Sequence, residues 1–99
     1  NDFGYEYVFA RIIEAQARKG DILFLLSTSG NSPNIIKALE VAHAKNITSV
    51  GMTGASGGEL NDKCTYMLRM PSFDTARIQE CHILIGHILC EMIEQSLFD

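Results

Sequence analysis

Apolar positions recur along the chain with two periods, one typical of helices and one typical of buried strands. Helical spacing of Val8, Ile12 and Ala15 predicts a helix over 5–18, which Gly20 ends. Residues 21–26 (DILFLL) then form a short apolar run. Such a run is typical of a strand that is covered on both faces in a parallel sheet. The chain is therefore expected to open with a helix and a buried strand.

The same alternation continues to the end of the chain. A polar loop at 27–32 (STSGNS) precedes a helix that begins at Pro33, with Ser32 as its N-cap, and ends near residue 45 or 46. The elements expected after it are a strand at 47–52, a glycine-rich turn at 53–58, a short helix at 59–63, a strand at 65–70 and a helix at 75–97. This order predicts an α/β fold, a three-layer α/β/α sandwich around a parallel sheet. Three strands are few for such a domain, so we expect part of a larger sheet.

Composition and charge narrow the class of protein. Hydrophobic residues make up 46% of the 99 residues and charged residues 20%, which suits a globular domain. The net charge of −4, without a basic patch, argues against direct binding of nucleic acid. No apolar run reaches the ~18–20 residues of a membrane span, and no signal peptide is visible. The chain begins with Asn1 and not with Met, so we expect a fragment of a longer protein.

The three cysteines indicate a reducing compartment. Cys64, Cys81 and Cys90 are odd in number and lack CxxC spacing. Two of them lie in the apolar last helix. We expect buried, reduced thiols in a cytoplasmic protein, in preference to a disulfide or a metal site.

The loop at 27–34 (STSGNSPN) is the strongest candidate for a binding site. It follows a buried strand and opens a helix, and ligands of open parallel sheets bind at that edge. A helix N-terminus offers free N–H groups and the positive end of a dipole, which suits an anion. Four hydroxyls add donors, and Gly30 permits a positive φ. With no lysine, the loop predicts a neutral phosphate site; the alternative is an N-capped loop of small residues.

The last helix is apolar on nearly all sides over 83–90 (ILIGHILC). Such a helix must be buried all round, and a chain of this size can hardly do so alone. We therefore expect a subunit interface, with Gly86 allowing close approach. Gln79, His82 and His87 interrupt the apolar surface. A buried histidine on such a helix is either a hydrogen-bonded core residue or a functional one, and the pattern alone leaves both open.

Several motifs resemble one family in the same order. They are NDFGYEYVFAR, GDILFLLSTSGNSPNIIKALE, TGASGGEL and ARIQECHILIGHILCEMIE. Together they cover essentially the whole chain and are similar to the C-terminal part of the sugar isomerase (SIS) domain in phosphoheptose isomerases. The resemblance implies that residues 1–99 hold the C-terminal three strands of that domain, and that its N-terminal part is missing.

The resemblance also implies a reaction and a set of site residues. The family interconverts sedoheptulose 7-phosphate and D-glycero-D-manno-heptose 7-phosphate, a heptose of lipopolysaccharide and other surface glycans. By the match, the sugar phosphate is bound by Ser27, Thr28, Ser29 and Ser32. Gln79 and His87 would face the active site, with His87 as a general acid/base. In zinc-containing members these two positions bind the metal, with a His and a Glu from an earlier helix that this chain lacks.

Geometry and family pattern give further expectations for the last helix. Gln79 and His87 are eight residues apart, ~12 Å along a regular helix, so the spacing alone does not demonstrate a shared metal. His82 lies ~140° around the helix from His87 and is expected in the core. His43 is expected on a solvated helix surface. The apolar surface of the helix at 75–97 also predicts a homo-oligomer, a dimer or tetramer, formed through this helix.

The sequence is also compatible with a second function, that of an adaptor protein. One SIS-domain relative is an adaptor without enzyme activity that binds the bacterial replication initiator. It carries Asn where this chain has His87 and Arg where this chain has Ser29. This sequence keeps both residues of the enzyme type, which favours the isomerase. A regulator that senses sugar phosphates ranks third, because no DNA-binding domain is visible.

Overall fold

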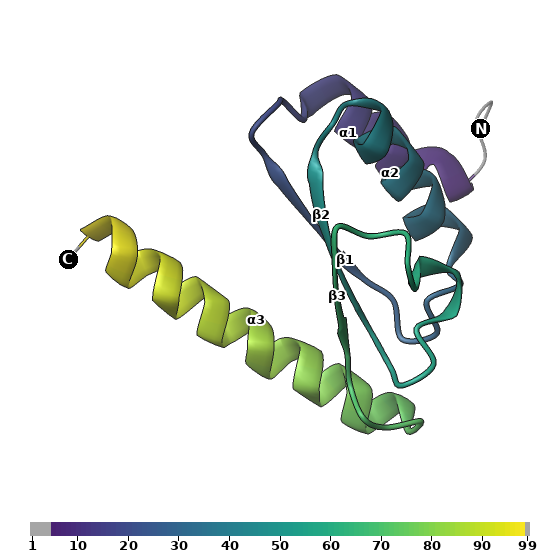
Figure 1. Ribbon diagram of the computed structural model, residues 1–99, viewed down its shortest axis with the longest axis vertical. Coiled ribbons are helices and arrows are strands. Elements are labelled where there is room, and N and C mark those ends of the chain that lie inside the picture. The colour runs from purple at the N-terminus through teal and green to yellow at the C-terminus, as the bar shows by residue number, and fades with distance from the viewer. Residues whose placement is uncertain (1–4, 99) are drawn as a thin grey trace.

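The computed structural model describes residues 5–98 and contains the predicted elements in the predicted order (Figure 1). Residues 1–4, the start of the first motif, lie outside this range. The helices are α1 (Val8–Gln16), which follows a 3₁₀ turn at Tyr5–Tyr7, α2 (Pro33–Ala44) and α3 (Thr75–Phe98). The strands are β1 (Ile22–Leu26), β2 (Thr48–Thr53) and β3 (Tyr66–Arg69). The short helix expected at 59–63 is instead a 3₁₀ helix at Gly58–Leu60.

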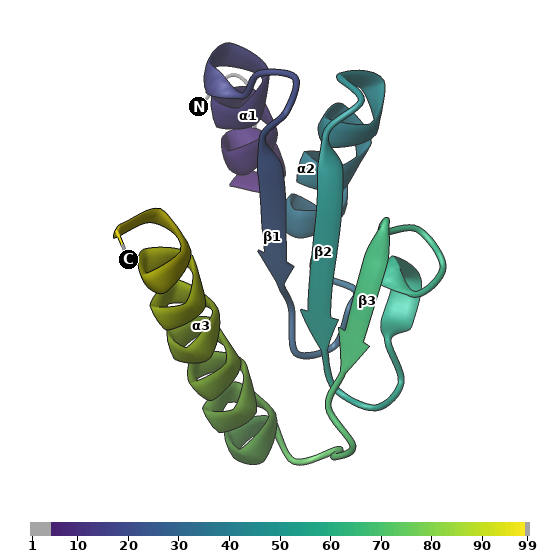
Figure 2. The ribbon, with the colours of Figure 1, turned by 60° about the vertical axis from the view of Figure 1, so that its left-hand side comes forward.

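The three strands form one parallel sheet in the order β1-β2-β3. Ile22 pairs with Thr48, and Val50 pairs with Tyr66. All three strands point the same way, so their carboxyl ends meet at one edge of the sheet (Figure 2). The prediction of a parallel sheet is confirmed, and that edge is where a ligand of such a fold is expected.

Helices lie on both sides of the sheet, as predicted. On one side of the sheet α1 and α2 pack together. The core there consists of Leu25 of β1, Ala38 and Leu39 of α2, and Leu60 of the 3₁₀ helix Gly58–Leu60. On the other side α3 starts at the carboxyl edge and contacts β2 (Figures 1 and 2). The three-layer α/β/α architecture is confirmed.

The expected cover on both faces of β1 is not provided by this chain. Leu25 is 2% exposed on the face towards α2, whereas Ile22 and Leu26 on the opposite face are 62% and 48% exposed. The reason is the course of α3, which diverges from the sheet towards its C-terminus (Figure 2). Within the described part of the chain, this face of β1 therefore stays partly exposed.

The prediction that α3 is buried on all sides is also wrong for this chain by itself. Only Ile78 and His82, near the start of the helix, are buried. Further along, Leu84 is 60% exposed and Met92 59% exposed. No helix of the described residues is long and apolar enough to cross a membrane.

The cysteines differ from the prediction in burial but not in redox state. All three are free thiols. Cys64 and Cys81 are half-buried, whereas Cys90 is exposed because it lies on the diverging part of α3. The expectation of a buried thiol is therefore wrong for Cys90.

Lys45 connects the end of α2 to the end of α1. Its Nζ atom donates hydrogen bonds to the backbone carbonyl oxygens of Glu14 and Ile13, at 2.8 and 3.3 Å. Carbonyls in the last turn of a helix lack partners within the helix, and a cation there also suits the negative end of the helix dipole. This contact stabilises the pair α1/α2 at a distance from the carboxyl edge of the sheet.

Candidate functional site

A cavity of about 540 Å³ opens at the carboxyl edge of the sheet. Three segments form its walls: the loop 27–32 after β1, the turn 54–56 after β2, and the connection 72–75 that leads into α3. The four residues predicted to bind phosphate, Ser27, Thr28, Ser29 and Ser32, all line it. The described residues that line the cavity carry no charged side chain, so any anion held here is held by hydrogen bonds.

The N-terminus of α2 faces this loop but is capped differently from the prediction. Ser32 occupies the N-cap position, yet its side chain makes no cap hydrogen bond. Its backbone carbonyl accepts the N–H groups of Ile35 and Ile36, at 3.1 and 3.0 Å. The hydroxyl instead lies 2.8 Å from the hydroxyl oxygen of Ser27. The Ser32 side chain is thus turned towards the loop and away from the helix amides.

The hydrogen bonds of this serine pair show which hydroxyl can serve a ligand. Ser27 is only 4% exposed, and its Oγ accepts the backbone N–H of Gly30 at 3.0 Å. A buried hydroxyl hydrogen needs an acceptor, and the Oγ of Ser32 is the one within reach. Either hydroxyl can donate in this pair. When Ser27 donates to Ser32, the hydrogen of the Ser32 hydroxyl is free for a ligand in the cavity.

Backbone amides add donors to the same wall. In the part of the chain that the structure describes, the N–H groups of Thr28, Ser29, Ser32 and Asn34 have no hydrogen-bond partner. Amides in the first turn of a helix lack partners within the helix and are suited to bind oxygen atoms of an anion. Together with the hydroxyls of Thr28, Ser29 and Ser32 they form a neutral, donor-rich surface.

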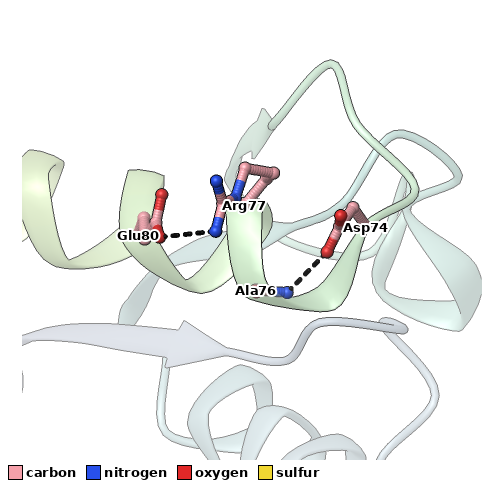
Figure 3. A network of polar contacts seen from close by, with 4 residues as sticks. All are labelled: Asp74, Ala76, Arg77 and Glu80. Carbon is pink, nitrogen blue, oxygen red and sulfur yellow. Dashed lines mark hydrogen bonds and ion pairs between the residues drawn. The ribbon is translucent and has the colours of Figure 1, made fainter.

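The start of α3 contrasts with the start of α2. The carboxylate of Asp74 accepts the backbone N–H of Ala76 at 3.0 Å (Figure 3). The backbone N–H of Asp74 donates to the hydroxyl of Ser72 at 3.0 Å. One turn on, Arg77 and Glu80 form an exposed ion pair of 2.9 Å. A carboxylate already occupies the positive end of the α3 dipole. The wall formed by loop 27–32 is therefore the part of the cavity that favours an anion.

Sequence reasoning missed the second and third walls of the cavity. Ser56, Ser72 and Thr75 line it beside the predicted loop. A signal was present, because Ser56 follows β2 and Ser72 follows β3, and the carboxyl ends of parallel strands meet at one edge. The backbone also joins these walls: Gly54 N–H donates to the Thr28 carbonyl at 3.0 Å.

Gln79 lies close to the predicted phosphate loop. A second cavity of about 280 Å³ is lined by Leu26, Thr28, Gln79, His82 and Ile83. It shares Leu26 and Thr28 with the larger cavity, so the two cavities adjoin each other. The structure thus brings the side of α3 that carries Gln79 beside the serine loop.

The two histidines of α3 have different surroundings. His82 is 4% exposed, and its Nε2 lies 3.1 Å from the carbonyl oxygen of Thr53, which bears out its interpretation as a core residue. His87 is exposed and lines neither of these two cavities. It was expected in a buried apolar setting, and that expectation is wrong for this chain by itself, because α3 has already left the sheet at this point. His43 is exposed, as predicted.

The residues present do not make a metal site by themselves. Within residues 5–98 no group of three or more His, Cys, Asp and Glu side chains could hold a metal ion. Gln79 and His87 are separated by two turns of α3, ~12 Å along a regular helix. A zinc ion usually has three or four protein ligands, so these two residues could contribute only part of a site.

Comparison with known proteins gives a consistent result. The sequence profile of the family described as "SIS domain" matches residues 1–54. Phosphoheptose isomerase 2 of Campylobacter jejuni is 56% identical over 98 residues, and phosphoheptose isomerase of Aneurinibacillus thermoaerophilus is 51% identical over 98 residues. Each alignment covers 99% of this chain but only 49% and 50% of the respective relative.

Solved structures show the same similarity. A phosphoheptose isomerase from Francisella tularensis superposes with a TM-score of 0.90 and one from Neisseria gonorrhoeae with 0.87, each at 41% identity. Both alignments cover 94% of this chain, and 50% and 53% of the respective neighbours. The chain therefore spans about half the length of the relatives that it matches.

Proposed function

Since this chain belongs to the SIS-domain family and resembles phosphoheptose isomerases over almost its whole length, we propose that it is part of such an enzyme. The reaction we propose interconverts sedoheptulose 7-phosphate and D-glycero-D-manno-heptose 7-phosphate, which supplies heptose for lipopolysaccharide or other surface glycans. The matching relatives carry the isomerase name, which favours the isomerase over the adaptor.

The observation that supports this proposal best is the wall of the larger cavity formed by loop 27–32. A phosphate group there would meet the hydroxyls of Thr28, Ser29 and Ser32 and the unpaired amides at the start of α2. Hydrogen bonds from neutral donors to a charged acceptor are stronger than those between neutral groups. The cavity volume of about 540 Å³ is also within the range of small-molecule sites.

Isomerisation requires a proton to leave one carbon and another to reach its neighbour, with an enediolate between them. A base and an acid that both work near neutral pH are needed, and imidazole is suited to either part. We propose His87 as one of this pair and Gln79 as a residue that contacts substrate or metal. Both assignments rest on the family resemblance, and the partner carboxylate lies outside this chain.

A second subunit is part of the proposal. His87 is exposed among apolar residues that are also exposed, with Leu84 at 60% and Ile88 at 47%. Burying this surface of α3 in a homodimer or homotetramer, or against the remainder of the protein, would place His87 in an enclosed setting. Zinc is proposed only as a metal ion that Gln79 and His87 would bind together with residues beyond this chain. A cytoplasmic location is proposed from the free thiols and the phosphorylated substrate.

The test uses the full-length protein. Purified protein is incubated with sedoheptulose 7-phosphate, and formation of the aldose phosphate is followed; unphosphorylated sedoheptulose is the matched substrate control. We expect turnover of the phosphate ester and a much lower kcat/KM for the free sugar. The isomerase proposal fails if no aldose forms, and the phosphate assignment fails if both sugars react equally well. Stable binding to the replication initiator without turnover would instead favour the adaptor.

A further inference from the structure

The phosphate loop is held in place by a second loop that follows β2. The backbone carbonyl of Gly30 accepts the N–H of Leu60 at 3.1 Å. The side-chain oxygen Oδ1 of Asn31 accepts the N–H of Glu59 at 2.8 Å. These two bonds join consecutive residues of loop 27–32 to consecutive residues at the 3₁₀ helix Gly58–Leu60.

Glycines allow the two loops to approach this closely. Gly30 and Gly58 both have positive φ angles, of 75° and 56°. A Cβ atom on Gly30 would overlap the carbonyl oxygen of Gly57, and one on Gly58 would overlap that of Ser29. The backbones of the two loops are thus in direct contact at these glycines.

Asn31 is the side chain that bridges the two loops. The serine side chains of loop 27–32 form hydrogen bonds within that loop. The Asn31 side chain instead forms a hydrogen bond with the second loop. The backbone N–H of Asn31 also donates to the hydroxyl of Ser29 at 3.1 Å, which leaves the Ser29 hydrogen for another acceptor. Asn31 does not line the cavity, so it orders the loop from outside.

We propose that Asn31 is a positioning residue for phosphate binding. Its amide oxygen fixes the distance between the two loops and so holds the donors of Ser29 and Ser32 in one arrangement before the phosphate arrives. A loop without this contact samples other conformations, and the apparent affinity for phosphate falls with the population of the competent one. The proposal rests on the proposed phosphate site, and Asn31 itself does not touch the substrate.

The experiment measures two quantities on the full-length protein: the Kd for inorganic phosphate by calorimetry, and KM and kcat for sedoheptulose 7-phosphate. Asn31→Ala is expected to raise the Kd and KM about three- to tenfold, the range that loss of one intramolecular hydrogen bond produces in an equilibrium constant. Because the contact supports binding and not proton transfer, kcat is expected to change less than twofold.

A matched control separates positioning from general loss of stability. Lys45→Met removes hydrogen bonds to the carbonyls of Glu14 and Ile13, away from the carboxyl edge of the sheet. It is expected to lower the melting temperature while leaving the Kd for phosphate unchanged. An equal rise in Kd for Lys45→Met and Asn31→Ala would overturn the proposal, since the effect would then follow stability alone.

A conservative variant tests the hydrogen bond itself. Asn31→Asp keeps an acceptor for the N–H of Glu59 but adds a negative charge near the phosphate loop. Its deficit in phosphate binding is expected to shrink when the salt concentration rises from about 0.05 to about 0.5 M, because the Debye length falls from about 14 to about 4 Å. The deficit of Asn31→Ala is expected to persist. If Asn31→Ala does not fold, Asn31→Ser, which is too short to reach Glu59, takes its place.

The outcomes distinguish this inference from the proposed function. If the wild-type protein binds phosphate and Asn31→Ala leaves the Kd unchanged, the role of Asn31 is contradicted. The isomerase proposal then still stands. Wild-type protein that does not bind phosphate contradicts the phosphate site itself, and the positioning role with it. Wild-type protein that binds phosphate but forms no aldose contradicts the isomerase alone, and the phosphate Kd then decides about Asn31.

Discussion

The Nε2 atom of His82 lies 3.1 Å from the backbone carbonyl oxygen of Thr53, and both residues are buried. Thr53 is the last residue of β2, and His82 belongs to the second turn of α3. The contact thus attaches the helix that carries Gln79 and His87 to the sheet edge that carries the phosphate loop. Nε2 donates to this carbonyl when that nitrogen carries a hydrogen.

Replacing His82 is expected to destabilise the fold. His82→Leu removes one hydrogen bond to the buried carbonyl of Thr53, which still accepts the N–H of Met70 at 2.9 Å. Loss of one such bond costs about 0.5–1.5 kcal/mol in the free energy of unfolding. The measurement is urea unfolding of the full-length protein. His43→Leu is the control, because His43 is exposed on α2 and a surface change of this kind usually alters stability by less than ~0.5 kcal/mol. Equal losses for the two variants would show that the contact does not contribute.

Periodicity predicted the order of the elements well, and Pro33 begins α2 as expected. The expected stop of the first helix at Gly20 was wrong: α1 ends at Gln16 with Ala17 as its C-cap, and Gly20, with a φ angle of 97°, belongs to the turn that leads into β1. The polar contacts were harder to foresee. Ser32 looked like a side-chain cap, but the hydroxyl of Ser27, five residues earlier, competes for it. A contact of this kind depends on the curvature of the loop, which composition does not encode.

Burial was the feature that sequence patterns predicted least reliably. An apolar pattern states how much surface must be covered but not what covers it. For α3 and for one face of β1, the described residues provide little of that cover. For the same reason His87 is exposed where a buried position was expected.

Removing two hydroxyls from the phosphate loop is expected to weaken substrate binding. In the full-length protein, Ser29→Ala combined with Ser32→Ala should raise KM for the phosphosugar at least about 100-fold, because each of the two hydrogen bonds to a charged group contributes about 1.5–3 kcal/mol. Thr48→Ala removes a hydroxyl at the opposite edge of the sheet and should leave KM unchanged. Unchanged KM and unchanged inhibition by inorganic phosphate in the double variant would refute the assignment.

The thiols should differ in reactivity with pH. Burial raises the pKa of Cys64 above its ordinary value, and a hydrogen bond with Ser49 opposes this only in part. Because the thiolate is the reactive form, Cys64 should alkylate more slowly than the exposed Cys90 at pH 8–9, a range that spans the ordinary thiol pKa of ~8.5. Mass spectrometry of iodoacetamide-treated protein measures the two rates.

The same shift has a consequence for stability. A folded-state pKa above the unfolded one means that the folded protein favours the neutral thiol. The stability associated with Cys64 is therefore fully present below the unfolded pKa and is lost as pH rises through the folded pKa. Cys64→Ser should reduce this loss of stability at alkaline pH, and Cys90→Ser should not.

In the alkylation experiment, equal rates for Cys64 and Cys90 would contradict the raised pKa of Cys64.

The apolar surface of α3 should mediate assembly of the full-length protein. Sedimentation at micromolar concentration is expected to give a dimer or tetramer. Leu84→Glu places a charge on a side chain that is 60% exposed in this chain, so it should shift the protein towards smaller species without unfolding it. Glu80→Gln, on the polar part of the same helix, is the control. A folded, monomeric wild type would rule out this surface as a subunit interface.

The role of His87 is the prediction that separates an enzyme from a binding protein with the same fold. General acid/base groups typically contribute ~10²–10⁴-fold in rate. His87→Asn keeps a polar side chain of similar size but cannot exchange a proton near neutral pH, so kcat should fall by about that factor. Because His87 is exposed and His82 is buried against Thr53, His87→Asn should preserve stability better than His82→Asn.

The comparison of these two histidine variants decides the assignment. His82→Asn should lower the melting temperature with a much smaller effect on kcat, and His87→Asn should do the reverse. Equal losses of kcat in the two variants would mean that His87 acts only through structure. The chain would then lack its proposed proton-transfer residue, and the phosphate loop would serve recognition alone, which is the property expected of an adaptor or a sugar-phosphate sensor.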